Sequence, residues 1–174
     1  GDQWYNWPVS QWALRVKYNL QPDIYAQIGA YEYNPENLQR AKGFNLSTDG
    51  SRGAIIPIEL VWSPKLGQHS LSGEYRFGYY YSTADAVDIS NPTKTSHKQG
   101  GWFTAKQQLI RQDTDSDRGL SGFINVTVHD SKNNAIKDMQ NVGLIYKGLF
   151  EQRPQDELAL GVHVSTLTMK IILY

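Results

Sequence analysis

Apolar and polar residues alternate with a period of two along most of this chain, in segments of about ten residues. Every second residue of segment 11–20 is apolar or aromatic: Trp12, Leu14, Val16, Tyr18 and Leu20. An α-helix, with about 3.6 residues per turn, would scatter these side chains around its axis. The segment therefore predicts a β-strand with one apolar face and one polar face.

The alternation returns in seven further segments, at residues 24–33, 56–62, 74–81, 102–111, 120–129, 142–150 and 158–165. In segment 102–111 it does not show which residues share a face. Eight strands of about ten residues have the length that a tilted strand needs to cross a bilayer, roughly 9–11 residues. Strands of soluble proteins usually have about five or six residues. The chain is therefore predicted to be all-β.

The connections between these segments differ in length in an ordered way. In sequence they are short (21–23), long (34–53), moderate (63–70), long (82–100), short (112–118), intermediate (130–140) and short (151–157). Membrane barrels have short turns on one side of the membrane and longer loops on the other. The pattern favours an antiparallel up-and-down transmembrane β-barrel over a Greek-key sandwich, which does not need such alternation.

The composition agrees with a barrel and excludes several other classes. The 174 residues contain 17 basic and 17 acidic side chains, so nothing indicates general affinity for nucleic acid. The absence of cysteine excludes disulfides and thiolate metal sites. The mean hydropathy is −0.53, but a barrel wall alternates lipid-facing and water-facing residues and so averages as polar. The 11 Tyr, 5 Trp and 5 Phe are many aromatic residues for so polar a chain.

Polar side chains on the faces opposite the apolar residues are the strongest functional signal. The candidate pore-lining or substrate-contact residues are Arg15, Lys17, Tyr25, Gln27, Glu59, Glu74 and Arg76. If the apolar face meets lipid, these side chains line water and can exchange hydrogen bonds with sugar hydroxyls, while aromatic rings offer a flat apolar surface. We expect Arg76 to have a carboxylate partner, with Glu59 favoured. The alternative is a soluble β-sheet domain that binds carbohydrate on this face without catalysis.

Catalytic and metal-binding patterns are weak in this sequence. Asp113, Asp115 and Asp117 alternate as in a calcium loop, but an EF-hand needs Gly and Glu where Arg118 and Ile124 stand, so we expect a solvated turn. The four histidines are dispersed, two of them in predicted loops and two on strands: His69, His97, His129 and His163. We therefore expect no enzyme activity, metal or cofactor. An outer-membrane hydrolase is a third and weaker class, which a nucleophile–histidine pair within hydrogen-bond reach would support.

A series of motifs, in order along nearly the whole chain, resembles the OprB family of carbohydrate-selective porins. They are WYNWPVSQW at 4–12, YAQIGAYEYNP at 25–35, GFNLST at 43–48, IIPIELVWSP at 55–64, the tyrosine-rich strand from Gly73, GLSGFINVTVHD at 119–130 and GLIYKGLFEQRPQDELALGVHVS at 143–165. The resemblance implies a sixteen-stranded barrel in the outer membrane of a Gram-negative bacterium. It also implies passive diffusion of glucose and similar small sugars, with sugars and membrane lipid as the partners.

The extent of the resemblance predicts a partial chain. Family members are more than twice as long, the chain starts at Gly1 rather than methionine, and residues 166–174 diverge from the family pattern. We therefore expect one partial barrel domain over residues 1–174, barrel-like over 4–165, with about eight strands. The sheet should be an open half-barrel in which residues 11–20 do not pair with 158–165.

Overall fold

The computed structural model describes residues 11–38, 46–113 and 117–168. The motif at 4–10, the first residues of GFNLST, Asp115 and the end of the divergent tail lie outside the described residues. Among the described residues, no helix is long and apolar enough to cross a membrane.

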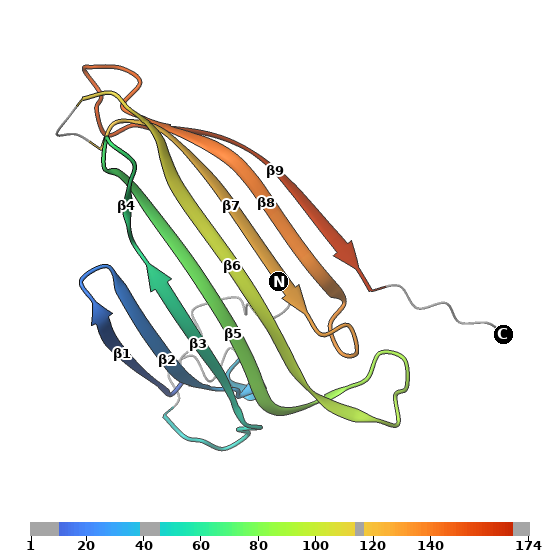
Figure 1. The fold of residues 1–174 in the computed structure, drawn as a ribbon. Coiled ribbons are helices and arrows are strands. Elements are labelled where there is room, and N and C mark those ends of the chain that lie inside the picture. The colour runs from blue at the N-terminus through green and yellow to red at the C-terminus, as the bar shows by residue number, and fades with distance from the viewer. Residues whose placement is uncertain (1–10, 39–45, 114–116, 169–174) are drawn as a thin grey trace.

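The described residues form one antiparallel sheet of nine strands (Figure 1). The elements in chain order are β1 (Ala13–Gln21), β2 (Ile24–Glu32), the 3-10 helix η1 (Pro35–Leu38), β3 (Ala54–Trp62), β4 (Lys65–Leu66), β5 (Leu71–Val87), β6 (Thr95–Arg111), β7 (Gly119–His129), β8 (Ile136–Lys147) and β9 (Glu157–Leu167). The sheet order is β1-β2-β3-β5-β6-β7-β8-β9, and the short strand β4 pairs with β5. Each long strand is thus hydrogen-bonded to its predecessor in the chain, which confirms the predicted up-and-down order.

The sheet is open. β1 pairs with β2 alone and β9 with β8 alone, so within the described residues the two end strands do not meet. Figure 1 shows them at opposite margins of the sheet. This confirms the predicted half-barrel.

Two predicted connections prove wrong in length. The long connection expected at 82–100 is mostly strand, because β5 and β6 each have 17 residues and leave only residues 88–94 between them. Likewise β8 begins at Ile136 rather than near residue 142. In both places polar residues replace the apolar ones. The hydrophobic alternation therefore stops, although the backbone hydrogen bonds between the strands continue. A β-bulge between Tyr81 and Asp85 marks this change within β5.

The strand registers confirm the two predicted sets of faces. Val16 pairs with Ile28, Ile28 with Ile58 and Ile58 with Tyr79, so these apolar side chains share one face, which we call the apolar face. The opposite face of the sheet, which we call the polar face, carries Lys17, Gln27 and Glu59, aligned in the same way.

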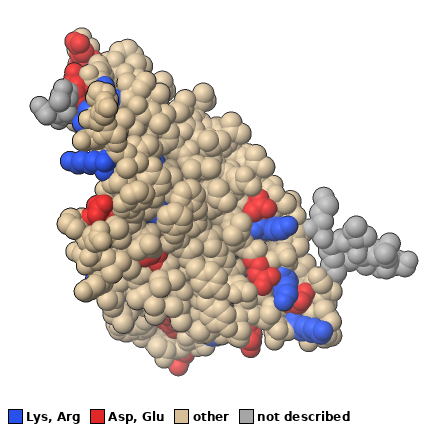
Figure 2. Space-filling model, in the orientation of Figure 1, with Lys and Arg blue, Asp and Glu red and all other residues tan. Residues whose placement is uncertain are grey.

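Exposure on the two faces is the reverse of that in a soluble protein. In the interior strands β3 and β5, Ile58 and Phe77 of the apolar face are 51% and 53% exposed, whereas the Glu59 side chain on the polar face is 11% exposed. The end strands β1 and β9 are exposed on both faces. Figure 2 shows that Lys, Arg, Asp and Glu gather mainly toward the two ends of the strands, leaving a largely uncharged middle. A broad exposed apolar surface of this kind indicates contact with lipid or with another protein.

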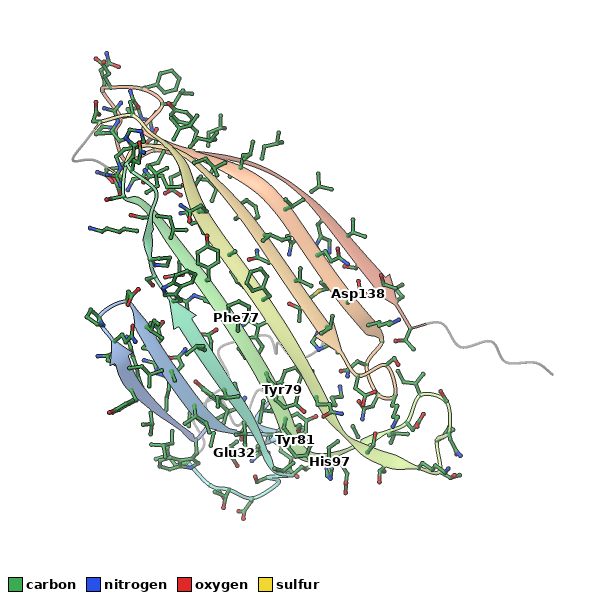
Figure 3. The ribbon with its side chains drawn as sticks, in the orientation of Figure 1. Glu32, Phe77, Tyr79, Tyr81, His97 and Asp138 are labelled. Atoms are coloured by element: carbon green, nitrogen blue, oxygen red, sulfur yellow. The ribbon has the colours of Figure 1, made fainter. Side chains whose placement is uncertain are left out.

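Aromatic side chains flank the apolar band at both ends of the strands. Tyr79 and Tyr81 lie toward one end of β5, beyond Phe77 (Figure 3). At the opposite end of the sheet the apolar face carries Tyr18, Trp62, Tyr75 and Tyr146. Such pairs of aromatic belts occur where a transmembrane barrel meets the two membrane–water interfaces.

A second bulge explains why the alternation in residues 102–111 does not show which of these residues share a face. In β6 the register shifts between Gln108 and Ile110, so Leu109 is an extra residue and the alternation changes phase. Before the bulge, Trp102 lies on the polar face, aligned with Gly78, and Phe103 lies on the apolar face, aligned with Phe77.

Candidate functional site on the polar face

The polar face carries a row of aligned residues across five neighbouring strands. Going from β1 to β6 it contains Lys17, Gln27, Glu59, Gly78 and Trp102. Because residues aligned in adjacent strands lie side by side on one face, three of the predicted site residues are brought together here.

The Glu59 carboxylate is the centre of this row. Its Oε1 accepts hydrogen bonds from Gln27 Nε2 at 2.8 Å and from the Arg76 guanidinium at 3.1 Å. Its Oε2 accepts a hydrogen bond from Trp102 Nε1 at 2.9 Å. The donors come from β2, β5 and β6, so one carboxylate from β3 fixes side chains of three other strands.

Arg76 lies between two carboxylates. Its guanidinium contacts Glu59 at 3.1 Å and Glu74 at 2.9 Å. The expected carboxylate partner is confirmed, but Glu59 shares this role with Glu74, whose contact is the shorter one. The Arg76 side chain is 31% exposed and that of Glu74 47% exposed, so solvent screens both pairs. Each contributes on the order of 0–1 kcal/mol to stability. Their main effect is a fixed polar surface with donors and acceptors at known positions.

Trp102 is the residue of this site that the sequence did not reveal. A Cβ built on Gly78 would lie 2.0 Å from the Trp102 ring atoms Cε2 and Cζ2, so the indole covers the Gly78 backbone. Glycine within a strand often marks such a close approach of another group. Because of the bulge in β6, the alternation alone does not show that Trp102 lies on the polar face.

The remaining predicted residues lie beside this row. The Lys17 ammonium is 3.8 Å from the centroid of the Tyr25 ring, a cation–π contact between β1 and β2. Arg15 is aligned with Gly29 and shares the polar face with Lys17. All seven predicted residues are thus on one face. Four of them form the cluster around Glu59, namely Gln27, Glu59, Glu74 and Arg76. Two more form the Lys17–Tyr25 contact.

The polar face is hollowed farther along, toward the turns that follow β6 and β8. A cavity of about 340 Å³ is lined there by charges of both signs, including Glu74, Lys106, Lys147 and Glu157. In the adjoining turn the Lys147 ammonium contacts the Asp117 carboxylate and holds the pKa of Asp117 below its usual range. Asp113 contacts Arg118 at 3.4 Å in the same turn, so the described acids of this segment pair with cations.

The histidines occupy separate positions. The prediction that two lie in loops is wrong for His97, which belongs to β6 and packs against Tyr81. The strand β6 begins before the segment in which apolar residues alternate, so the sequence pattern does not include His97. His129 contacts the Tyr80 hydroxyl at 2.7 Å on the polar face. Within the described part of the chain, no group of three or more His, Cys, Asp and Glu could hold a metal ion.

His163 and Ser165 form a histidine–hydroxyl pair within hydrogen-bond reach, which is the feature expected of a hydrolase. His163 Nε2 lies 2.6 Å from Ser165 Oγ, and its Nδ1 lies 2.6 Å from Asn141 Oδ1. All three side chains lie on the polar face of β8 and β9, and both His163 and Ser165 are exposed.

Comparisons with known proteins agree with this architecture. The sequence profile described as "Carbohydrate-selective porin, OprB family" matches residues 1–170. The chain is 50% identical over 175 residues to Porin B of Pseudomonas aeruginosa, covering 93% of this chain and 38% of that protein. It is 40% identical over 167 residues to the putative porin QuiX of Acinetobacter baylyi, with the same two coverages, 93% and 38%.

Solved structures show the same fold. The high-pH structure of Pseudomonas putida OprB matches with a TM-score of 0.87 and 49% identity, over 95% of this chain and 42% of that one. The low-pH structure of the same porin matches with a TM-score of 0.63 and 42% identity, over 94% and 43%. The chain thus spans about two fifths of the length of the relatives it matches. It belongs to the OprB family of carbohydrate-selective porins and is an outer-membrane protein.

Proposed function

We propose that the chain forms part of the wall of a channel through which small sugars such as glucose diffuse passively across the outer membrane. The apolar face lies against lipid, and the polar face lines the water-filled interior. The reversed exposure of the two faces in β3 and β5 carries this proposal, because no soluble sheet gains by exposing Ile58 and Phe77 while enclosing Glu59. Family membership disfavours the alternative of a soluble carbohydrate-binding domain.

The wall acts by replacing part of the hydration of the sugar. The lining residues proposed are Arg15, Lys17, Tyr25, Gln27, Glu59, Glu74 and Arg76. Guanidinium and ammonium groups donate to hydroxyl oxygens, and carboxylates accept from hydroxyl protons. Because most of these groups already bond one another, each contact with a passing sugar is weak. Weak contacts allow the solute both to enter and to leave.

The sheet needs further strands to work in this way. We propose that residues 1–174 form one partial domain of a closed barrel, with sixteen strands as the resemblance to the family implies. The relatives are long enough to supply the remaining strands, since the chain covers 38% of Porin B. Closure satisfies the backbone groups at the free edges of β1 and β9, which lipid cannot do.

We propose that this function involves no catalysis, metal or cofactor. The contact between His163 and Ser165 lies on an exposed part of the wall. Catalytic serines act in sites that exclude water and present preorganised donors to a developing oxyanion. Asn, His and Ser side chains aligned on one polar face also bond one another without chemistry. Specific labelling of Ser165 by a serine-reactive phosphonate would overturn this part of the proposal.

Charge reversal at Arg76 tests the lining role. The variant is made in the full-length porin, by which we mean the closed barrel that contains these 174 residues. There Arg76→Glu should shift the ion preference of the channel toward cations and change the flux of glucose. It places a third carboxylate beside Glu59 and Glu74 and removes a donor from the wall. The measurements are the reversal potential in a salt gradient and the swelling rate of proteoliposomes in glucose.

Arg153→Glu is the matched control, because Arg153 is 71% exposed and lies in the turn between β8 and β9. It should leave both quantities close to those of the wild-type channel. If Arg76→Glu also changed neither ion preference nor glucose flux, the polar face around Glu59 would not line the pathway.

A further inference from the structure

We infer that the indole of Trp102 is a stacking platform for the ring of a pyranose sugar, and that it favours cyclic sugars over open-chain polyols of similar size. This inference rests on the proposed channel function and adds a substrate-contact residue to it. Three observations support it: the orientation of the indole, its fixation, and the polar groups at its margin.

The orientation follows from Gly78. A Cβ at this position would point away from the sheet on the polar face and would lie 2.0 Å from two atoms of the indole. The ring therefore covers Gly78 on β5 rather than standing upright beside it. A ring in this position rests one face on the backbone and leaves the opposite face for the space that the polar face borders. Trp102 is neither fully buried nor fully exposed, as this position requires.

The fixation follows from Glu59. Trp102 starts on β6, crosses β5 at Gly78 and donates its Nε1–H to Glu59 Oε2 on β3 at 2.9 Å. The indole thus spans three strands and is held at its far end. A ring held in this way loses little additional freedom when a sugar stacks on it, which lowers the entropic cost of binding.

Polar groups border the platform on two sides. On β5, Gly78 stands between Arg76 and Tyr80, both of which share its face. The Arg76 guanidinium is held by Glu59 and Glu74 and remains 31% exposed. Glu59 accepts three hydrogen bonds, and a carboxylate offers about four acceptor positions, so it can take one more from a hydroxyl.

This arrangement matches the chemistry of a pyranose. A sugar ring with mostly equatorial hydroxyls presents a flat face of C–H groups and an edge of hydroxyls. The C–H face fits an aromatic surface, and the hydroxyl edge fits the charged groups at its border. A linear polyol has the same hydroxyls but no fixed flat face. Glucose should therefore bind at Trp102, whereas sorbitol should gain little from the ring.

The test uses the full-length porin in planar lipid bilayers. The quantity measured is the glucose concentration that half-blocks the potassium current through the channel. Trp102→Ala should raise this concentration about two- to tenfold, the range expected for loss of one aromatic face contact. Trp102→Phe keeps a ring but loses the bond to Glu59, and it should raise the concentration less than Trp102→Ala does. The half-blocking concentration of sorbitol should change in neither variant.

Trp62→Ala is the matched control. Trp62 is also a strand tryptophan, but it lies on the apolar face, where its ring contacts Tyr75 and its Nε1 bonds Asp23. It should leave half-block by glucose unchanged. An unchanged value in Trp102→Ala, or equal shifts for glucose and sorbitol, would overturn the platform while leaving the channel intact. Failure of the wild-type porin to pass glucose in liposome swelling would instead overturn the proposed function.

Discussion

Replacing Val142 by arginine should lower the free energy of unfolding of the full-length porin in lipid vesicles by about 2–4 kcal/mol. Val142 lies in the middle of β8 on the apolar face, where it is 56% exposed. Its aligned neighbours are Ile124 on β7 and Val162 on β9, so no charge of opposite sign is adjacent on either strand. If this face meets hydrocarbon, the guanidinium must either lose its hydration or distort the bilayer. Urea titration of the folded protein in vesicles measures the difference.

Asn125→Arg is the matched control for this substitution. Asn125 lies on β7 on the polar face, aligned with Asn141 and Thr104. An arginine there should remain hydrated and cost less than about 1 kcal/mol, as surface substitutions usually do. Equal small losses for both variants would mean that the apolar face does not lie in lipid.

The 174 residues alone should not carry sugar across a membrane. β1 and β9 do not pair with each other in the described structure, and each leaves a row of backbone N–H and C=O groups without a strand partner. In lipid each unsatisfied group costs several kcal/mol, so only a closed barrel can span. Liposomes containing the 174-residue chain should therefore show no sustained swelling in glucose, whereas liposomes containing the full-length porin should swell.

Closure of the short chain on itself is the competing possibility. A barrel of eight strands has an interior just wide enough to be filled by side chains. The polar face of this chain carries Arg15, Lys17 and Arg76, which suit a wide wet interior better than a packed one. Sustained swelling with the 174-residue chain would show that it closes or assembles into a pore and would refute this reasoning.

The facing of the strands could be predicted from the sequence because period-two alternation follows directly from the β geometry. In β1, β2, β3, β5 and β7 the apolar and polar sets lie as the alternation indicated. The ends of β5, β6 and β8 could not be predicted. There the strands continue past the apolar band. If both faces meet water in these parts, apolar and polar residues have no reason to alternate, and the sequence shows no period of two.

The ion pair between Arg76 and Glu59 was predictable for a simple reason: consecutive strands form a hairpin, so their polar residues lie on adjacent strands of the same face. Trp102 was not predictable. Its facing depends on a bulge at Leu109, seven residues away, and its orientation depends on a glycine in another strand. Neither feature produces a periodic pattern in the sequence. Gly78, within a tyrosine-rich strand, is the one sequence signal of a close approach at this place.

We propose that one face of the sheet meets lipid and the other meets water, and single spin labels along β7 distinguish these two environments. The 174 residues contain no cysteine, so each introduced cysteine in this part of the protein carries the only label there. Labels are placed one at a time at residues 123–128 of the full-length porin in lipid vesicles. Collision with oxygen, which dissolves in lipid, and with a water-soluble nickel chelate is then measured. We predict that oxygen collisions peak at Ile124, Val126 and Val128, and nickel collisions at Phe123, Asn125 and Thr127. Equal nickel collisions at all six positions, or the opposite alternation, would mean that the apolar face of β7 does not lie in lipid.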